Sequence, residues 1–208
     1  MGKRSNFFKS KNRRRKNIRP PKPIILIVCE GEKSEKFYFD GFRKEARISN
    51  VEIEVIGKGR PGNSLLKFTQ NKVKNESITY DQIWIVFDKD DLSDEEFDSI
   101  VSKAIYRNKM NVAYSIPCFE YWLLLHFDYY NTPLTTKDCI KKLKNRFPVY
   151  RKNLDDVYYK LADKKYSAIE NAKRMEDEHK KQGNTKPSSK NPSTLVYKLV
   201  IELEKFLK

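Results

Sequence analysis

Residues 83–92 read IWIVFDKDDL, an apolar run that ends in a cluster of acids. Residues 83–87 show no alternation of polar and apolar side chains, which is typical of a central strand covered on both faces of a parallel sheet. Ligands bind in the crevice outside the carboxyl ends of such strands. The acids that follow this run therefore lie where a functional site is expected.

The spacing of Asp88 and Asp90 predicts a metal site. Because side chains alternate along an extended chain, these two carboxylates point the same way while Lys89 points aside. Two converging carboxylates suit a hard divalent cation, Mg2+ before Zn2+. The alternative is helix capping, which needs one carboxylate and which we expect of Asp91 or Asp94. A cluster of three carboxylates repels itself unless a cation or hydrogen bonds offset the charge.

Three further apolar segments predict strands, and helical patterns follow each strand. The strands are expected at residues 24–29, 51–56, 83–87 and 112–116, and the helices at 32–42, 63–75, 94–108 and 118–127. This alternation predicts an α/β fold with a mainly parallel sheet flanked by helices. Amphipathic basic helices are then expected at residues 136–147, 154–180 and 193–207.

Three regions are therefore predicted. They are a disordered basic arm (residues 1–23), an α/β core (24–130) and an added C-terminal helical region packed on the core (131–208). The chain carries a net charge of +15, and residues 1–23 contain ten Lys and Arg residues and no acid. Such a segment cannot bury enough surface to fold alone. The charge favours nucleic acid as partner, with a solubilising tail as the alternative.

Basic residues in three places are candidates for contacting phosphate. They are Arg13, Arg14 and Arg15 in the arm, Lys58 and Arg60 in the glycine-containing loop 57–63, and Lys190 in the loop 183–192. Aromatic residues Phe7 and Phe8 lie among the charges of the arm, as in proteins that bind single strands. For both loops the alternative is an ordinary solvated connection.

The cellular setting is inferred from cysteines and hydropathy. Three cysteines in no metal-binding spacing predict neither a disulfide framework nor a zinc site, which fits a reducing cytoplasm. No stretch approaches the roughly 18 apolar residues of a membrane span. We expect a cytoplasmic protein.

Two more carboxylates follow strand ends. Glu30 and Gly31 follow the strand at 24–29, and Glu120 lies in the first turn of the helix expected at 118–127. Glu120 is either a partner of the helix dipole or a carboxylate directed at the same site as Asp88.

These motifs resemble a known family. Glu30 after the first strand, with Asp88 and Asp90 after the third, resembles the Toprim domain of topoisomerases, primases and OLD-type nucleases. The segments IVCEGEKSE, VFDKDD, PCFEYWLLLHF and KNPST together look like the RloB-like family of small bacterial Toprim proteins. The resemblance covers about residues 24–205.

The resemblance implies a Toprim-like, Rossmann-like sheet with a Mg2+ or Mn2+ site. It implies that Glu30 is the general acid or base beside the metal and that Asp88 and Asp90 hold the cation. Glu120, Asp91 and Glu35 are candidates for further carboxylates, with Glu120 the best. It also implies a metal-dependent nuclease of phage defence that cleaves DNA or RNA, including tRNA, with an ATPase partner from the same locus.

Two alternatives stay open. One is a non-catalytic subunit that binds nucleic acid and the ATPase. The other is a dehalogenase-like phosphatase, in which Asp88 is the nucleophile and Asp90 the acid. That family carries its motif at the domain start, followed by a small hydroxyl residue, whereas Asp91 and Leu92 follow here.

Overall fold

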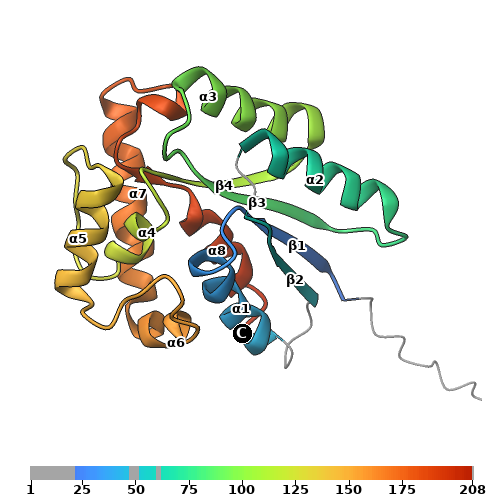
Figure 1. Cartoon of the computed structure of the whole chain (residues 1–208), viewed down its shortest axis with the longest axis horizontal. Coiled ribbons are helices and arrows are strands. Elements are labelled where there is room, and N and C mark those ends of the chain that lie inside the picture. The colour runs from blue at the N-terminus through green and yellow to red at the C-terminus, as the bar shows by residue number, and fades with distance from the viewer. Residues whose placement is uncertain (1–21, 47–51, 60–61, 208) are drawn as a thin grey trace, which may run out of the picture.

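A computed structural model describes residues 22–46, 52–59 and 62–207. Within them the chain forms one five-stranded sheet in the order β2-β1-β3-β4-β5 (Figure 1). The strands are β1 (Ile24–Cys29), β2 (Glu52–Gly57), β3 (Gln82–Asp88), β4 (Asn111–Ile116) and β5 (Ser193–Thr194). The first four are parallel, and β5 pairs antiparallel to β4. The expected α/β fold with a mainly parallel sheet is confirmed.

The apolar runs are unalternating because both faces of the sheet are covered. In β3, Trp84 and Val86 join one hydrophobic cluster, while Ile85 and Phe87 join the cluster on the opposite face. Both sets of side chains are almost fully buried. Continuous burial of this kind is what a central parallel strand requires.

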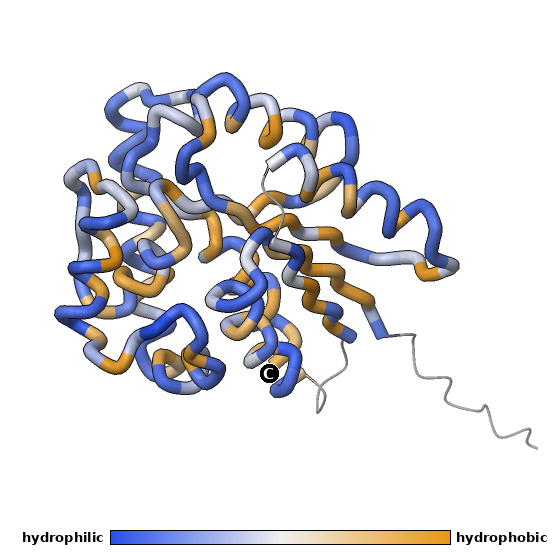
Figure 2. Tube along the Cα trace, in the orientation of Figure 1, coloured by the Kyte–Doolittle hydropathy of each residue, from blue (hydrophilic) through white to orange (hydrophobic). Residues whose placement is uncertain are grey.

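Helices pack on both faces of the sheet. Helices α2 (Gly62–Asn75) and α3 (Asp94–Ser102) cover one face, and α1 (Ser34–Ala46) and α8 (Val196–Glu204) cover the other (Figure 1). The remaining helices are α4 (Glu120–Leu124), α5 (Thr136–Arg146), α6 (Val157–Leu161) and α7 (Lys165–Lys181). Each of these four helices contributes buried apolar residues to the hydrophobic cluster that also contains those of α1 and α8. Figure 2 colours the trace by the hydropathy of each residue. No helix in the described part of the chain is long and apolar enough to cross a membrane.

Three local predictions differ from the structure. The helix expected at 154–180 is interrupted by a 3-10 turn at Ala162–Lys164, because α6 packs on α1 whereas α7 packs on α4 and α8. The helix expected at 193–207 begins with β5, where Thr194 pairs with Ser115 of β4 and their hydroxyls lie 3.0 Å apart. Ser93, and neither Asp91 nor Asp94, caps α3 by accepting a hydrogen bond from the Glu96 N–H.

Candidate active site

Six carboxylates line one cavity of about 460 Å3 at the carboxyl ends of the parallel strands. They are Glu30 and Glu32 after β1, Glu35 in α1, Asp88 at the end of β3, Asp90 in the following loop and Glu120 at the start of α4. The cavity therefore brings together Glu30, Asp88, Asp90 and Glu120, which the sequence singled out. Of the other candidates, Glu35 also lines it, whereas Asp91 lines a neighbouring cavity.

Glu30 and Asp88 meet because β1 and β3 are adjacent and parallel. The Glu30 N–H donates to the Val86 carbonyl over 2.8 Å, and the Asp88 N–H donates to Glu30 Oε2 over 3.4 Å. Asp88 is only 9% exposed, and its Oδ1 has no hydrogen-bond partner among the described residues. A buried carboxylate oxygen without a donor is destabilising unless a ligand satisfies it.

Burial and mutual repulsion shift the acidities of these groups. Burial raises the pKa of Glu30 to about 7, and nearby Glu35 and Asp90 add to the rise. The pKa of Asp88 is raised well above its usual range, first by burial and then by the charges of Glu35 and Asp90. The pKa values of Glu35 and Asp90 are raised too, again chiefly by burial. The cavity therefore holds excess negative charge that a cation would relieve.

Asp90 is held by a residue of α5. Its backbone has a φ of +34°, a region that is costly for a residue with a Cβ. The Thr136 hydroxyl donates to Asp90 Oδ1 over 3.1 Å, and the Asp90 N–H donates to the Pro117 carbonyl. These contacts fix the direction of the Asp90 carboxylate.

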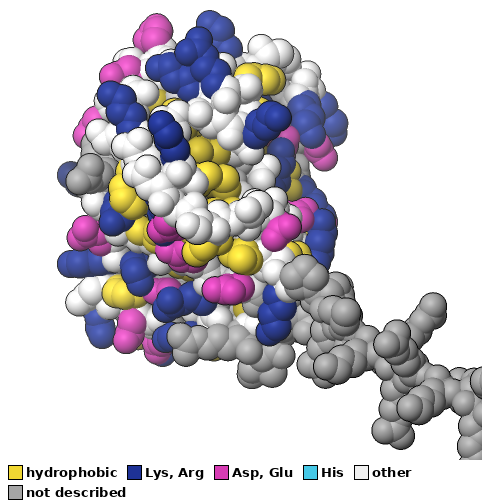
Figure 3. Space-filling model, turned by 90° about the vertical axis from the view of Figure 1, so that its right-hand side faces the viewer, with side chains coloured by type: hydrophobic (Ala, Val, Ile, Leu, Met, Phe, Trp, Pro, Cys, Tyr) yellow, Lys and Arg dark blue, Asp and Glu magenta, His cyan; other side chains and the backbone are white. Residues whose placement is uncertain are grey.

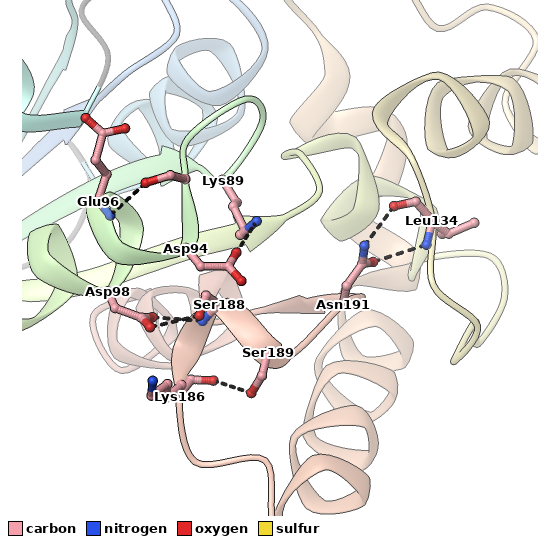
Figure 4. Close-up of polar contacts among 10 residues, drawn as sticks. Lys89, Asp94, Glu96, Asp98, Leu134, Lys186, Ser188, Ser189 and Asn191 are labelled. Atoms are coloured by element: carbon pink, nitrogen blue, oxygen red, sulfur yellow. Dashed lines mark hydrogen bonds and ion pairs between the residues drawn. The ribbon is translucent and has the colours of Figure 1, made fainter.

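The start of α5 is in turn fixed by Asn191. Its side chain accepts from the Leu134 N–H and donates to the Leu134 carbonyl, both over 3.1 Å (Figure 4). On the same segment, Ser188 donates from its N–H and hydroxyl to Asp98 of α3 (Figure 4). Residues 188–194, which include the KNPST segment, therefore join α3, the loop before α5 and, through Thr194, strand β4.

Glu120 is held by Tyr150, which sequence reasoning did not identify. The Tyr150 hydroxyl donates to Glu120 Oε1 over 2.7 Å, and the hydroxyls of Tyr150 and Ser34 lie 3.1 Å apart. Glu120 is 3% exposed. No local pattern distinguishes Tyr150 from the other eleven tyrosines of the chain.

Gly31 provides room for Glu35. A Cβ at Gly31 would lie 2.0 Å from Glu35 Oε2, so no larger residue fits while Glu35 keeps this position. The absence of a side chain at Gly31 therefore lets the Glu35 carboxylate lie close to the backbone.

Lys33 and Lys152 are the basic residues that line the cavity. The Lys152 charge lowers the pKa of both Glu35 and Asp90, against the stronger effect of burial. Its carbonyl accepts from the Ser34 hydroxyl over 3.3 Å, which ties its loop to the start of α1. Neither lysine was singled out from the sequence.

The predicted phosphate-binding residues lie apart from this cavity or outside the described residues. Lys58 places its Nζ 4.3 Å from the centre of the Phe68 ring, and only its neighbour Gly59 lines the cavity. Lys190 is half-buried after a 3-10 turn and lines neither of the two neighbouring cavities. Arg13, Arg14, Arg15 and Arg60 lie outside the described residues.

The donor chemistry fits a hard divalent cation. Carboxylate oxygens are the ligands that Mg2+ and Mn2+ prefer, and Asp88 Oδ1 is a buried oxygen free to accept such an ion. In the conformation described for residues 22–46, 52–59 and 62–207, no three His, Cys, Asp or Glu side chains are already close enough to share a metal. Binding would therefore require these side chains to move toward one another.

A family model described as RloB-like protein matches residues 25–203. No curated protein and no solved structure gives a significant match.

Proposed function

The chain belongs to the RloB-like protein family, and from this premise we propose that it is a metal-dependent nuclease whose active site is the carboxylate cavity. The observation that carries the proposal is Asp88, a buried carboxylate with an oxygen that lacks a partner among the described residues, in one cavity with five more carboxylates. Burying such a group without a partner costs stability, which is typical of functional sites.

These residues would have two roles, since some would hold the metal ion and one would transfer a proton. Asp88, Asp90 and Glu120 would hold Mg2+ or Mn2+, with Asp90 directed by Thr136 and Glu120 by Tyr150. A bound divalent ion supplies polarisation of the scissile phosphate and a water of lowered pKa. Glu30, whose pKa of about 7 lets it exchange a proton near neutral pH, would act as general base or acid.

Lys152 would neutralise phosphate charge. It lies in the cavity with a positive charge that already acts on Glu35 and Asp90. A cation beside a transferring phosphoryl group stabilises the transition state more than the ground state.

The family resemblance supports the wider setting of the proposal. It favours phage defence, an ATPase partner from the same locus, and DNA or RNA, including tRNA, as substrate, while the cysteine pattern favours a cytoplasmic location. Copurification of the chain with the neighbouring ATPase tests the partner.

Cleavage of a panel of tRNA, single-stranded DNA and duplex DNA with Mg2+ or Mn2+ tests the activity. Asp88→Asn should abolish metal-dependent cleavage, whereas Glu95→Gln, an exposed acid of α3, should leave it intact. Glu30→Gln separates the alternatives, since a nuclease of this design loses cleavage while a dehalogenase-like enzyme keeps hydrolysis of a small phosphate ester. Binding without cleavage by the wild type, with its ATPase present, would favour the non-catalytic alternative.

A further inference from the structure

Helix α5 begins at the edge of the carboxylate cavity. Thr136, its first residue, donates a hydrogen bond to Asp90. The next residue, Lys137, lines a second cavity of about 400 Å3. Asp90 lines both cavities, so they adjoin one another at the start of α5. Helix α5 lies at the left edge of the molecule in Figure 1.

Three lysines form a stripe along the exposed face of this helix. Lys137, Lys141 and Lys144 are all exposed, and at 100° per residue they lie within about 60° of one another. The opposite side carries Cys139 and Leu143, which are fully buried. The stripe is therefore a continuous basic edge that starts beside Asp90.

These lysines lack the partners that other cations of the same helix have. Lys142 lies over the Tyr130 ring at 4.9 Å, and Arg146 pairs with Asp128. No described carboxylate forms an ion pair with any lysine of the stripe. On α7, by contrast, Lys173 and Lys180 pair with acids three residues earlier. Unpaired charge on one helical face is available to a polyanion.

We propose that Lys137, Lys141 and Lys144 bind the phosphate backbone of a nucleic-acid strand and lead its scissile phosphate to the carboxylate cavity. This rests on the proposed nuclease function and names the strand-binding surface of that site. At 1.5 Å per residue, the stripe spans about 10 Å, or about three phosphates of a strand that rises 3.4 Å per nucleotide. Lys33 and Lys152 then continue the positive charge into the cavity.

Net charge by itself is a competing explanation, because basic side chains gather elsewhere too. Figure 3 shows Lys and Arg side chains along the upper part of another face of the molecule. Helix α2 provides a matched control in Lys67 and Lys74. Like Lys137 and Lys144, they are exposed, seven residues apart on one helix, and without an ion-pair partner among the described residues.

The test compares Lys137→Gln/Lys144→Gln with Lys67→Gln/Lys74→Gln in the full chain. Fluorescence anisotropy measures binding to labelled single-stranded RNA and DNA of one sequence, in chelator, from 50 to 200 mM NaCl. Because each lost phosphate contact flattens the dependence of log K on log[salt] by about 0.7 for a single strand, the α5 pair should flatten it by about 1.4 and weaken binding by about tenfold. The α2 pair should match the wild type.

Chelator makes the measurement independent of cleavage. Equal salt slopes in the wild type and the α5 pair would overturn the inference, as would equal losses in both pairs or no binding by the wild type. The wild type could bind a strand through α5 and still cleave no nucleic acid when metal is added. That result would contradict the nuclease function and support the role of α5 in binding. The difference between RNA and DNA identifies which strand the surface prefers.

Discussion

Tyr150 donates its hydroxyl hydrogen to Glu120 Oε1 over 2.7 Å, across 30 residues of sequence. Glu120 lies at the start of α4, and Tyr150 lies in the loop after α5. Both side chains are buried. A residue after α5 thereby fixes the position of a carboxylate in the cavity at the carboxyl ends of the strands.

Tyr150→Phe should weaken binding of Mn2+ about tenfold and lower the free energy of unfolding by about 1–3 kcal/mol, because Glu120 loses a buried donor. Isothermal titration and urea unfolding measure the two effects. Tyr158→Phe removes an equally short bond, to Glu45, outside the cavity. It should lower stability without changing metal affinity, and equal affinity losses in both variants would contradict the role of Tyr150.

Asp88→Asn should raise the free energy of unfolding by about 1–3 kcal/mol at pH 8 in chelator, because a neutral amide replaces a buried carboxylate. The wild type should be stabilised by Mg2+, by about 2.7 kcal/mol at one hundred times Kd, and the variant should not. Asp40→Asn is the control, since buried Asp40 is paired with Lys36 and Arg43 and its loss should destabilise the protein. A destabilised Asp88→Asn variant would show that the carboxylate is already satisfied.

Raising the pH from about 4.5 to about 7 should destabilise the metal-free protein. The folded state raises the pKa of Glu30 to about 7, so it holds the proton more tightly than the unfolded chain does. The stabilisation that comes from protonated Glu30 is therefore complete below the pKa that Glu30 has in the unfolded chain. It is lost as the pH rises through the pKa that Glu30 has in the folded protein. Glu30 should account for on the order of 1–2 kcal/mol of this fall in the free energy of unfolding, after allowance for its partial exposure.

Urea unfolding in chelator between pH 4 and 8 measures this change. Glu30→Gln should flatten the profile in the same window. Stability that instead increases across this window would contradict the raised pKa of the cavity carboxylates.

Asn191→Ala should lower metal affinity although Asn191 is no ligand. It breaks two hydrogen bonds to Leu134, releases the start of α5 and so loosens the bond from Thr136 to Asp90. Thr136→Val should lower Mn2+ affinity about as much as Asn191→Ala does, whereas Thr136→Ser should leave the affinity unchanged. Because both changes act through one contact, their effects should not add in the double variant. Full additivity would mean that Asn191 acts elsewhere.

Gly31→Ala should displace Glu35 and reduce metal-dependent cleavage at least about tenfold, because the added Cβ would lie 2.0 Å from its carboxylate. Gly183→Ala is the comparison, since that glycine has a φ of +74° and nothing within 4 Å. It should cost about 1 kcal/mol of stability through backbone strain and leave cleavage unchanged. Normal cleavage by Gly31→Ala would show that Glu35 can move without consequence.

The local residue pattern is enough to predict the strands and the acids that follow them. The unalternating runs at 24–29 and 83–87 reflect burial on both faces, a local property that each strand carries in its own residues. Because parallel strands end at one edge, acids that follow two of them share that edge wherever the strands are adjacent. A common site for Glu30, Asp88 and Asp90 therefore follows from the sequence.

The rest of the site depends on how distant segments pack together. Lys152 lines the cavity, and Tyr150 and Thr136 donate hydrogen bonds to its carboxylates Glu120 and Asp90. All three lie in segments after α4, and nothing in their local sequence indicates these positions. The local sequence does not indicate β5 either, because its two residues form a strand only by pairing with the edge of β4. Secondary structure is encoded by periodicity within a few turns, whereas these contacts join residues 30 to 118 positions apart. Such contacts depend on how the helices pack, which no local pattern specifies.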